Sequence, residues 1–195
     1  PGKRSQSIDY RVIPGDTSDL GTSGPWEVLR GIVRGETWLH ESGASIPLAC
    51  TAIDSGAQTQ TVYTFCREWS QPQVLPIKGM DNQTKLIGIP KPVDVNQAGR
   101  KVRRGVMLWG LGTSLLKTEI YSNLKLERPT AESGDPLPPG WCDFPEYGEE
   151  YFKGLCSEQL MRVKNRAGYT VHRWEKLYER NEPLDCRQYA RAAAA

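Results

Sequence analysis

Short apolar segments separated by turn residues predict strands in the first half of the chain. Residues 46–53 form an apolar run of strand length that stops at the turn-forming residues 54–56. Residues 61–66 are rich in β-branched and aromatic side chains, so we expect them to form the antiparallel partner strand of a hairpin. Two further short apolar segments lie at residues 74–79 and 86–89, and a basic connection follows them.

The second half of the chain mixes strand and helix patterns. Residues 106–112 are almost continuously apolar, as in a strand that is covered on both faces. Leucine and isoleucine then recur at helical spacing over 115–124, after a threonine and a serine that can cap a helix. We further expect a loop over 129–139, a strand at 141–144, a helix at 149–159, a hairpin with strands at 161–163 and 169–174, and a last helix that starts at Asn181. Strands that pair first in hairpins and then alternate with helices predict an α/β sheet of mixed direction.

Glycine and proline are frequent at the start of the chain. We therefore interpret residues 1–44 as a linker that contains one short amphipathic helix near 26–33, which docks on the following domain. We expect residues 45–195 to form that domain.

The composition excludes several classes of protein. A chain of 195 residues with 38% hydrophobic residues can bury a core, and it has no apolar run of the roughly 20 residues that a membrane span requires. The five cysteines are odd in number and include no CxxC pair, and there are only two histidines. A zinc site or a disulfide framework is therefore not expected, and reduced thiols in a cytosol-like compartment are the simpler interpretation.

The net charge of +2 conceals separated charge clusters. Residues 85–104 carry a local balance of +5, residues 130–158 carry −6, and residues 161–180 return to +4. Such polarity can line a site that binds a polyanion beside cation-binding carboxylates. Charge alone favours the simpler interpretation, which is ordinary solvated faces.

Asp54 is the first candidate for chemistry. It follows an apolar strand and precedes the small residues Ser55 and Gly56, so we expect it at the carboxyl-terminal edge of the sheet, where α/β proteins place ligands. The alternative is a turn-initiating aspartate that caps its own backbone.

Two more acids begin the last helix. Glu182 and Asp185 lie three residues apart and so share one helix face. Acids in a first helical turn are often present only to complement the helix dipole. Together with Asp54, they could instead supply the oxygen ligands that Mg²⁺ or Mn²⁺ prefer.

Residues 110–118 superficially resemble a phosphate-binding loop. A P-loop needs glycine directly before its lysine, and Leu116 precedes Lys117 here, so nucleotide binding is rejected. The remaining feature is a strand-to-helix turn with free backbone N–H groups and Lys117 one turn later, which suits a phosphodiester.

Several blocks in a fixed order resemble the nuclease half of the phage lambda type of terminase large subunit. They are Ala52–Gly56, Val62–Arg67, Ile77–Gly79, Gly112–Lys117, Glu150–Phe152 with Leu155 and Glu158, and Asn181–Cys186 followed by Tyr189 and Ala190. The resemblance runs from about residue 45 to the end of the chain.

This resemblance implies an RNase H-like mixed sheet flanked by helices, and metal-dependent cutting of double-stranded DNA concatemers during phage genome packaging in the host cytoplasm. It implies that Asp54 and Asp185 hold two Mg²⁺ or Mn²⁺ ions. Ser114 stands where the family often has an aspartate, so Glu182 or Asp143 would be the third ligand, and the second ion would bind weakly without it.

The resemblance also implies roles for basic residues and partners. Lys78 and Lys117 would offset the charge that develops on the phosphate. The duplex backbone would be held by Arg100, Lys101, Arg103 and Arg104. Residues 1–44 would lead from the terminase ATPase domain, and the small terminase subunit and portal protein would be partners, without a membrane.

Two alternatives stay open. One is a catalytically weakened RNase H-like DNA-binding or assembly module of a packaging motor, which the serine at position 114 favours. The other is an RNase H-like resolvase or transposase, which shares the chemistry but not the blocks after residue 110.

Overall fold

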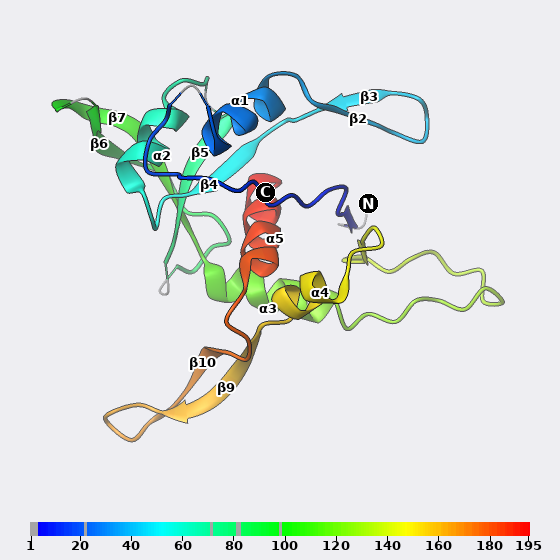
Figure 1. The fold of residues 1–195 in the computed structure, drawn as a ribbon. Coiled ribbons are helices and arrows are strands. Elements are labelled where there is room, and N and C mark those ends of the chain that lie inside the picture. The colour runs from blue at the N-terminus through cyan, green and yellow to red at the C-terminus, as the bar shows by residue number, and fades with distance from the viewer. Residues whose placement is uncertain (1–3, 22, 71, 81–82, 98) are drawn as a thin grey trace. The chain divides into compact units, whose positions relative to one another are not determined.

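The computed structural model describes residues 4–21, 23–70, 72–80, 83–97 and 99–195. The chain divides into two compact units, each built from segments that are distant in sequence. The sheet unit comprises Arg11–Thr113 and Tyr189–Ala195, and the hairpin unit comprises Pro1–Tyr10 and Ser114–Gln188. Their folds can be followed separately in Figure 1.

A four-stranded sheet with the order β4-β5-β7-β6 forms the centre of the sheet unit. β4 pairs in parallel with β5 and β5 in parallel with β7, whereas β6 and β7 are antiparallel. The predicted mixed direction is therefore confirmed. The strands are β4 (Thr51–Asp54), β5 (Val74–Gly79), β6 (Lys91–Gln97) and β7 (Arg100–Leu111).

The expected hairpin partner at 61–66 is wrong, because this segment belongs to helix α2 (Thr59–Cys66). Parallel strands cannot be joined by a tight turn, so the chain needs a crossover from β4 to β5, and α2 provides it. The helix buries Val62, Phe65 and Cys66 at helical spacing. Packing on the sheet thus outweighs the strand preference of its β-branched residues.

Helix α1 (Pro25–Gly35) contributes to the same core as α2, which confirms a helix near 26–33. Its Trp26 and Val33 are buried, and the rings of Trp26 and Phe65 lie 4.9 Å apart. Aromatic pairs at this distance add to the free energy gained from burial.

Three other details differ from the sequence patterns. The apolar run at 46–53 is split between β4 and a short strand, β3 (Ser45–Pro47), which pairs with β2 (Thr37–Leu39). The segment 86–89 makes a single bridge, from Ile87 to Leu111. The basic stretch expected as a connection forms β6 and the start of β7, which pair closely around a bulge between Val93 and Val95.

The hairpin unit follows its sequence pattern closely. Helix α3 (Thr113–Asn123) confirms the helix predicted from the leucine and isoleucine spacing, and the predicted late hairpin is confirmed as β9 (Glu158–Lys164) and β10 (Thr170–Lys176). Helix α4 (Glu149–Leu155) ends earlier than expected, because Glu158 already begins β9. The remaining elements are β1 (Ser5–Gln6), β8 (Cys142–Asp143) and α5 (Glu182–Ala193).

Close packing joins α4 to the start of α5. A side chain at Gly154 of α4 would meet the ring of Pro183 at 2.7 Å. Pro183 occupies the first turn of α5, where its missing N–H has no helical partner to lose. The first turn of α5, with Asp185, is thereby fixed within the hairpin unit.

The described residues form a mixed α/β fold with five helices and several small sheets. Within the same residues, no helix is both long and apolar enough to cross a bilayer.

Candidate functional site

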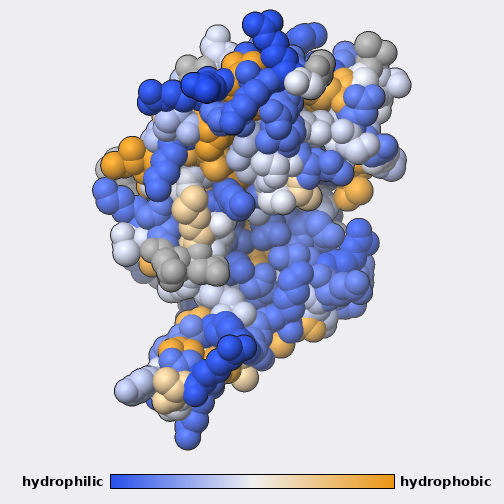
Figure 2. All heavy atoms as spheres, turned by 90° about the vertical axis from the view of Figure 1, so that its left-hand side faces the viewer, coloured by the Kyte–Doolittle hydropathy of each residue, from blue (hydrophilic) through white to orange (hydrophobic). Residues whose placement is uncertain are grey.

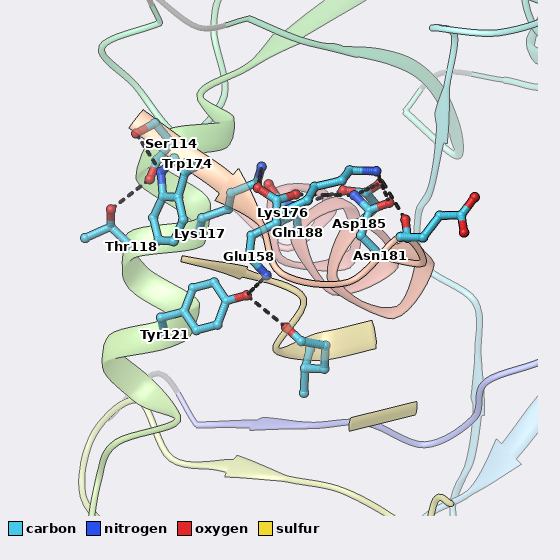
Figure 3. A network of polar contacts seen from close by, with 12 residues as sticks. Ser114, Lys117, Thr118, Tyr121, Glu158, Trp174, Lys176, Asn181, Asp185 and Gln188 are labelled. Atoms are coloured by element: carbon cyan, nitrogen blue, oxygen red, sulfur yellow. Dashed lines mark hydrogen bonds and ion pairs between the residues drawn. The ribbon is translucent and has the colours of Figure 1, made fainter. Parts of the chain in front are cut away.

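A network of polar side chains lies where α3, the base of the β9–β10 hairpin and the start of α5 meet within the hairpin unit (Figure 3). Its centre is Glu158, the first residue of β9, whose side chain is only 5% exposed. Lys117 of α3 places its Nζ 2.6 Å from Oε2 of Glu158. A buried carboxylate requires such compensation, because desolvation otherwise makes its charge costly.

Asn181, the residue before α5, links two carboxylates. Its Nδ2 donates to Oε1 of Glu158 at 3.3 Å and to Oδ2 of Asp185 at 3.0 Å. The spacing of four residues brings Asn181 and Asp185 to one side of the helix start. The described structure therefore brings the predicted ligand Asp185 close to Glu158.

Two further side chains complete the polar surroundings of Asp185. Gln188, one turn later in α5, donates through Nε2 to Oδ1 of Asp185 at 3.1 Å. Lys176 of β10 donates to Oδ1 of Asn181 at 3.2 Å. Figure 3 shows these residues together beside the α5 start.

Aromatic residues support the other side of the network. Tyr121 accepts the backbone N–H of Glu158 at 3.1 Å and donates to the Leu155 carbonyl at 3.2 Å. Burial raises the pKa of the Tyr121 phenol, so the group stays protonated and can donate at neutral pH. Tyr121 also stacks on Trp174, with the ring centroids 5.3 Å apart. These contacts hold the base of the hairpin against α3.

The donor atoms of this network fit a hard divalent cation in kind. Glu158 and Asp185 offer carboxylate oxygens, and Oε1 of Gln188 is buried without a hydrogen-bond partner within the described structure. Oxygen-only donors suit Mg²⁺ or Mn²⁺. Across the described residues, no three His, Cys, Asp or Glu side chains gather as a metal site would require.

The structure places Asp54 and Lys78 at the carboxyl-terminal edge of the sheet. Asp54 ends β4 opposite Ile77 of β5, and Lys78 is the next residue of β5. Oδ1 of Asp54 accepts the N–H of Gly56 at 3.1 Å, which is the turn-capping contact considered as the alternative. Both side chains belong to residues that are exposed, so both groups remain accessible to a ligand.

The three residues discussed for the third ligand position have other contacts. Glu182 is 57% exposed and lies 3.7 Å from Arg180. Asp143 accepts a hydrogen bond from its near neighbour Trp141 at 2.9 Å. Ser114 accepts one from Trp174 at 3.1 Å.

The predicted DNA-binding residues lie at the start of β7. Arg100, Lys101 and Arg103 line a surface hollow of about 680 Å³. Lys101 is paired with Asp94 at 2.9 Å, and Arg104, with a positive φ of 51°, donates its backbone N–H to the same carboxylate. The Arg104 N–H and then Lys101 hold the pKa of Asp94 below its usual range.

Sequence reasoning did not assign a site role to Glu158 or Gln188. Gln188 could have been found, because it follows Asp185 by three residues on the same helix face. Glu158 could not, because its partners Lys117 and Asn181 come from α3 and from the start of α5.

Comparison with known proteins gives a family assignment. The family of the terminase large subunit gpA endonuclease domain matches residues 1–195. The terminase large subunit of Escherichia phage lambda is 30% identical over 199 residues, and that of Enterobacteria phage P21 is 26% identical over 196 residues. Each alignment covers 99% of this chain and 28% of the relative. No solved structure matches the chain. With its whole length matched, the chain belongs to the family of terminase large subunit gpA endonuclease domains.

Proposed function

We propose that this chain is a metal-dependent endonuclease that cuts double-stranded DNA concatemers during phage genome packaging. The observation that carries the proposal is the match of the endonuclease family over residues 1–195. The chain spans only 28% of the length of its phage relatives, so their complete activity is not assumed for it. Within the hairpin unit, Asn181 bonds the carboxylates of both Glu158 and Asp185, and carboxylate oxygens are the donors that metal ions use in phosphodiester hydrolysis.

Asp54 and Asp185 are the proposed metal ligands, with Mg²⁺ or Mn²⁺ as the ions. When bound, two such ions supply an activated water and stabilisation of the leaving 3′ oxygen. Glu158 is a stronger candidate for a third ligand than Glu182, since Asn181 already holds Glu158 and Asp185 together while Glu182 is exposed. We propose an RNase H-like topology as the frame for these residues.

Lysines of the chain would act on the phosphate. Lys78 follows the residue opposite Asp54 and is exposed, so it can approach a phosphodiester near that carboxylate. Lys117 neutralises Glu158 in the described structure, and it would offset phosphate charge in the complex with DNA. Neither lysine needs to transfer a proton in this proposal.

The test is cleavage of supercoiled plasmid with Mn²⁺ by variants of the 195-residue chain. Asp54→Asn and Asp185→Asn should each abolish nicking, because each removes a charged ligand while keeping the side-chain volume. Asp135→Asn, an exposed loop acid, is the matched control and should cut normally. Circular dichroism should show unchanged folding for all three variants. Wild-type cleavage rates in either ligand variant would exclude the proposed role of that residue.

A specific observation favours the alternative of a catalytically weakened DNA-binding or assembly module. Lys117 already satisfies Glu158, and Ser114 is bonded to Trp174 rather than offering a carboxylate. A Mn²⁺ titration of cleavage separates the two functions. The endonuclease proposal expects wild-type nicking that saturates with Mn²⁺. The alternative module expects no nicking at any Mn²⁺ concentration.

Partners follow from the same assignment. We propose that the chain acts next to a terminase ATPase domain in the same polypeptide, with the small terminase subunit and the portal protein as further partners. Arg100, Lys101, Arg103 and Arg104 would contact the DNA backbone without reading the sequence.

A further inference from the structure

The β9–β10 hairpin extends away from the helices of its own unit as a two-stranded ribbon (Figure 1). Among the described strands, β9 and β10 pair only with each other. Side chains on both faces of the ribbon are exposed, including the apolar Leu160 at 44% and Met161 at 38%. Figure 2 shows hydrophobic side chains exposed among hydrophilic ones on the projecting hairpin, at the bottom of that view. An isolated two-stranded ribbon is only marginally stable in water, so one that projects in this way gains most from a partner.

The charge of the ribbon indicates the kind of partner. We define the outer hairpin as residues 159–174. It contains four Lys or Arg side chains and no Asp or Glu. Within the described chain, no carboxylate is paired with Arg162, Lys164 or Arg166, whereas Arg173 is paired with Glu175 at 2.6 Å. Three exposed cations without counter-ions favour a polyanion.

The register of the ribbon places two of these cations, Arg162 and Lys164, on the face that begins at the carboxylate network, and Arg166 lies in the turn at the tip. Residues directly opposite each other share a face, and the face alternates at each residue. The pairs on this face, from the base outward, are Glu158 with Lys176, Leu160 with Trp174, Arg162 with His172, and Lys164 with Thr170. The first two pairs include members of the network around Asp185. A cationic track therefore leads outward from the candidate site.

The tip of the ribbon has a defined conformation. Oδ1 of Asn165 accepts the N–H groups of Ala167 and Tyr169, both at 3.0 Å. Gly168 has a φ of 83°, which glycine adopts without strain in a turn of this kind. Arg166 and the 73% exposed Tyr169 are thus held at the end of a preformed structure rather than a loose loop.

We infer that the outer hairpin is a duplex DNA-binding arm that lies in the major groove and holds phosphates beside the cleavage site. A two-stranded ribbon fits the major groove of B-form DNA. Side chains on one face of a β-strand are ~7 Å apart. This spacing is about the axial distance from one phosphate to the second one along a single DNA strand. The statement that the bound phosphates lie beside the cleavage site rests on the proposed function. Binding of the outer hairpin to DNA does not require cleavage.

The test measures binding of the 195-residue chain to a duplex in EDTA, so that activity plays no part. The arm variant is Arg162→Gln, Lys164→Gln and Arg166→Gln together. The matched control carries Arg4→Gln, Lys125→Gln and Arg128→Gln, which are exposed cations of the same unit. Removing three phosphate contacts should reduce the slope of log K against log salt by about 2.7, and the control should keep the wild-type slope.

A second measurement uses duplex RNA of the same length. The major groove of A-form RNA is too deep and narrow for side chains to read, so the arm variant should lose affinity for DNA but little for RNA. The inference would be overturned if the arm variant kept the wild-type salt slope, or if the control variant lost as much slope as the arm variant. It would also be overturned if the wild-type chain did not bind the DNA duplex. If the salt slopes are as expected but the wild-type chain does not cleave DNA in the Mn²⁺ assay, the result counts against the proposed function and not against the binding arm.

Discussion

Glu158 shows how one residue can organise a site in the hairpin unit. Its carboxylate is almost fully buried and accepts from both Lys117 and Asn181. Lys117 and Glu158 should each serve mainly to neutralise the other. A single buried charge strongly destabilises the folded state, whereas a buried ion pair changes the free energy of folding little.

This argument predicts the outcome of a double-mutant cycle. Lys117→Met and Glu158→Gln should each destabilise the protein by about 3 kcal/mol, since each leaves an uncompensated buried group. The double variant should be more stable than the sum of the two losses implies. Urea unfolding without divalent metal measures the cycle. Strictly additive losses would mean that the two side chains do not compensate each other.

At the scale of elements, α2 is the clearest case of packing that decides structure. Phe65 is fully buried between α1 and the sheet, and Trp26 and Trp69 lie against it within the sheet unit. The helix is only eight residues long and lacks a side-chain cap, so intrinsic helix propensity cannot account for it.

Phe65→Ala should therefore cost about 3–5 kcal/mol, as large-to-small changes in cores do. The matched control is Phe152→Ala, in which the same change is made at a side chain that is 38% exposed, and it should cost about 1 kcal/mol or less. Denaturant unfolding followed by tryptophan fluorescence compares them. Similar losses for both variants would show that α2 is not anchored through Phe65.

The elements also show what could be predicted from the sequence. Helix α3 and the β9–β10 hairpin follow from local spacing and from turn residues such as Gly168. Helix α2 could not be predicted, because its β-branched and aromatic residues also suit a strand, and only the parallel pairing of β4 with β5 requires a crossover. The position of Asp185 in a first helical turn was predictable from Asn181, whereas its neighbour Glu158 depends on long-range contacts.

At the scale of the whole molecule, a net charge of +2 conceals two basic surfaces that belong to different units. One is the outer hairpin, and the other is the start of β7 with its hollow of about 680 Å³. The salt dependence of DNA binding counts phosphate contacts directly, whichever unit supplies them. It can therefore assign the affinity to each surface by separate substitution.

DNA binding at the start of β7 should release fewer counter-ions than its four cations suggest. Lys101 is already paired with Asp94, so only Arg100, Arg103 and Arg104 are expected to release counter-ions from DNA. Replacing all four with Gln should then lower the salt slope by about 2.7 rather than about 3.6. Fluorescence anisotropy with a labelled duplex between low and physiological salt measures the slope. Lys101→Gln alone should leave it unchanged. An unchanged slope in the fourfold variant would exclude the start of β7 from the DNA interface and leave the outer hairpin as the candidate.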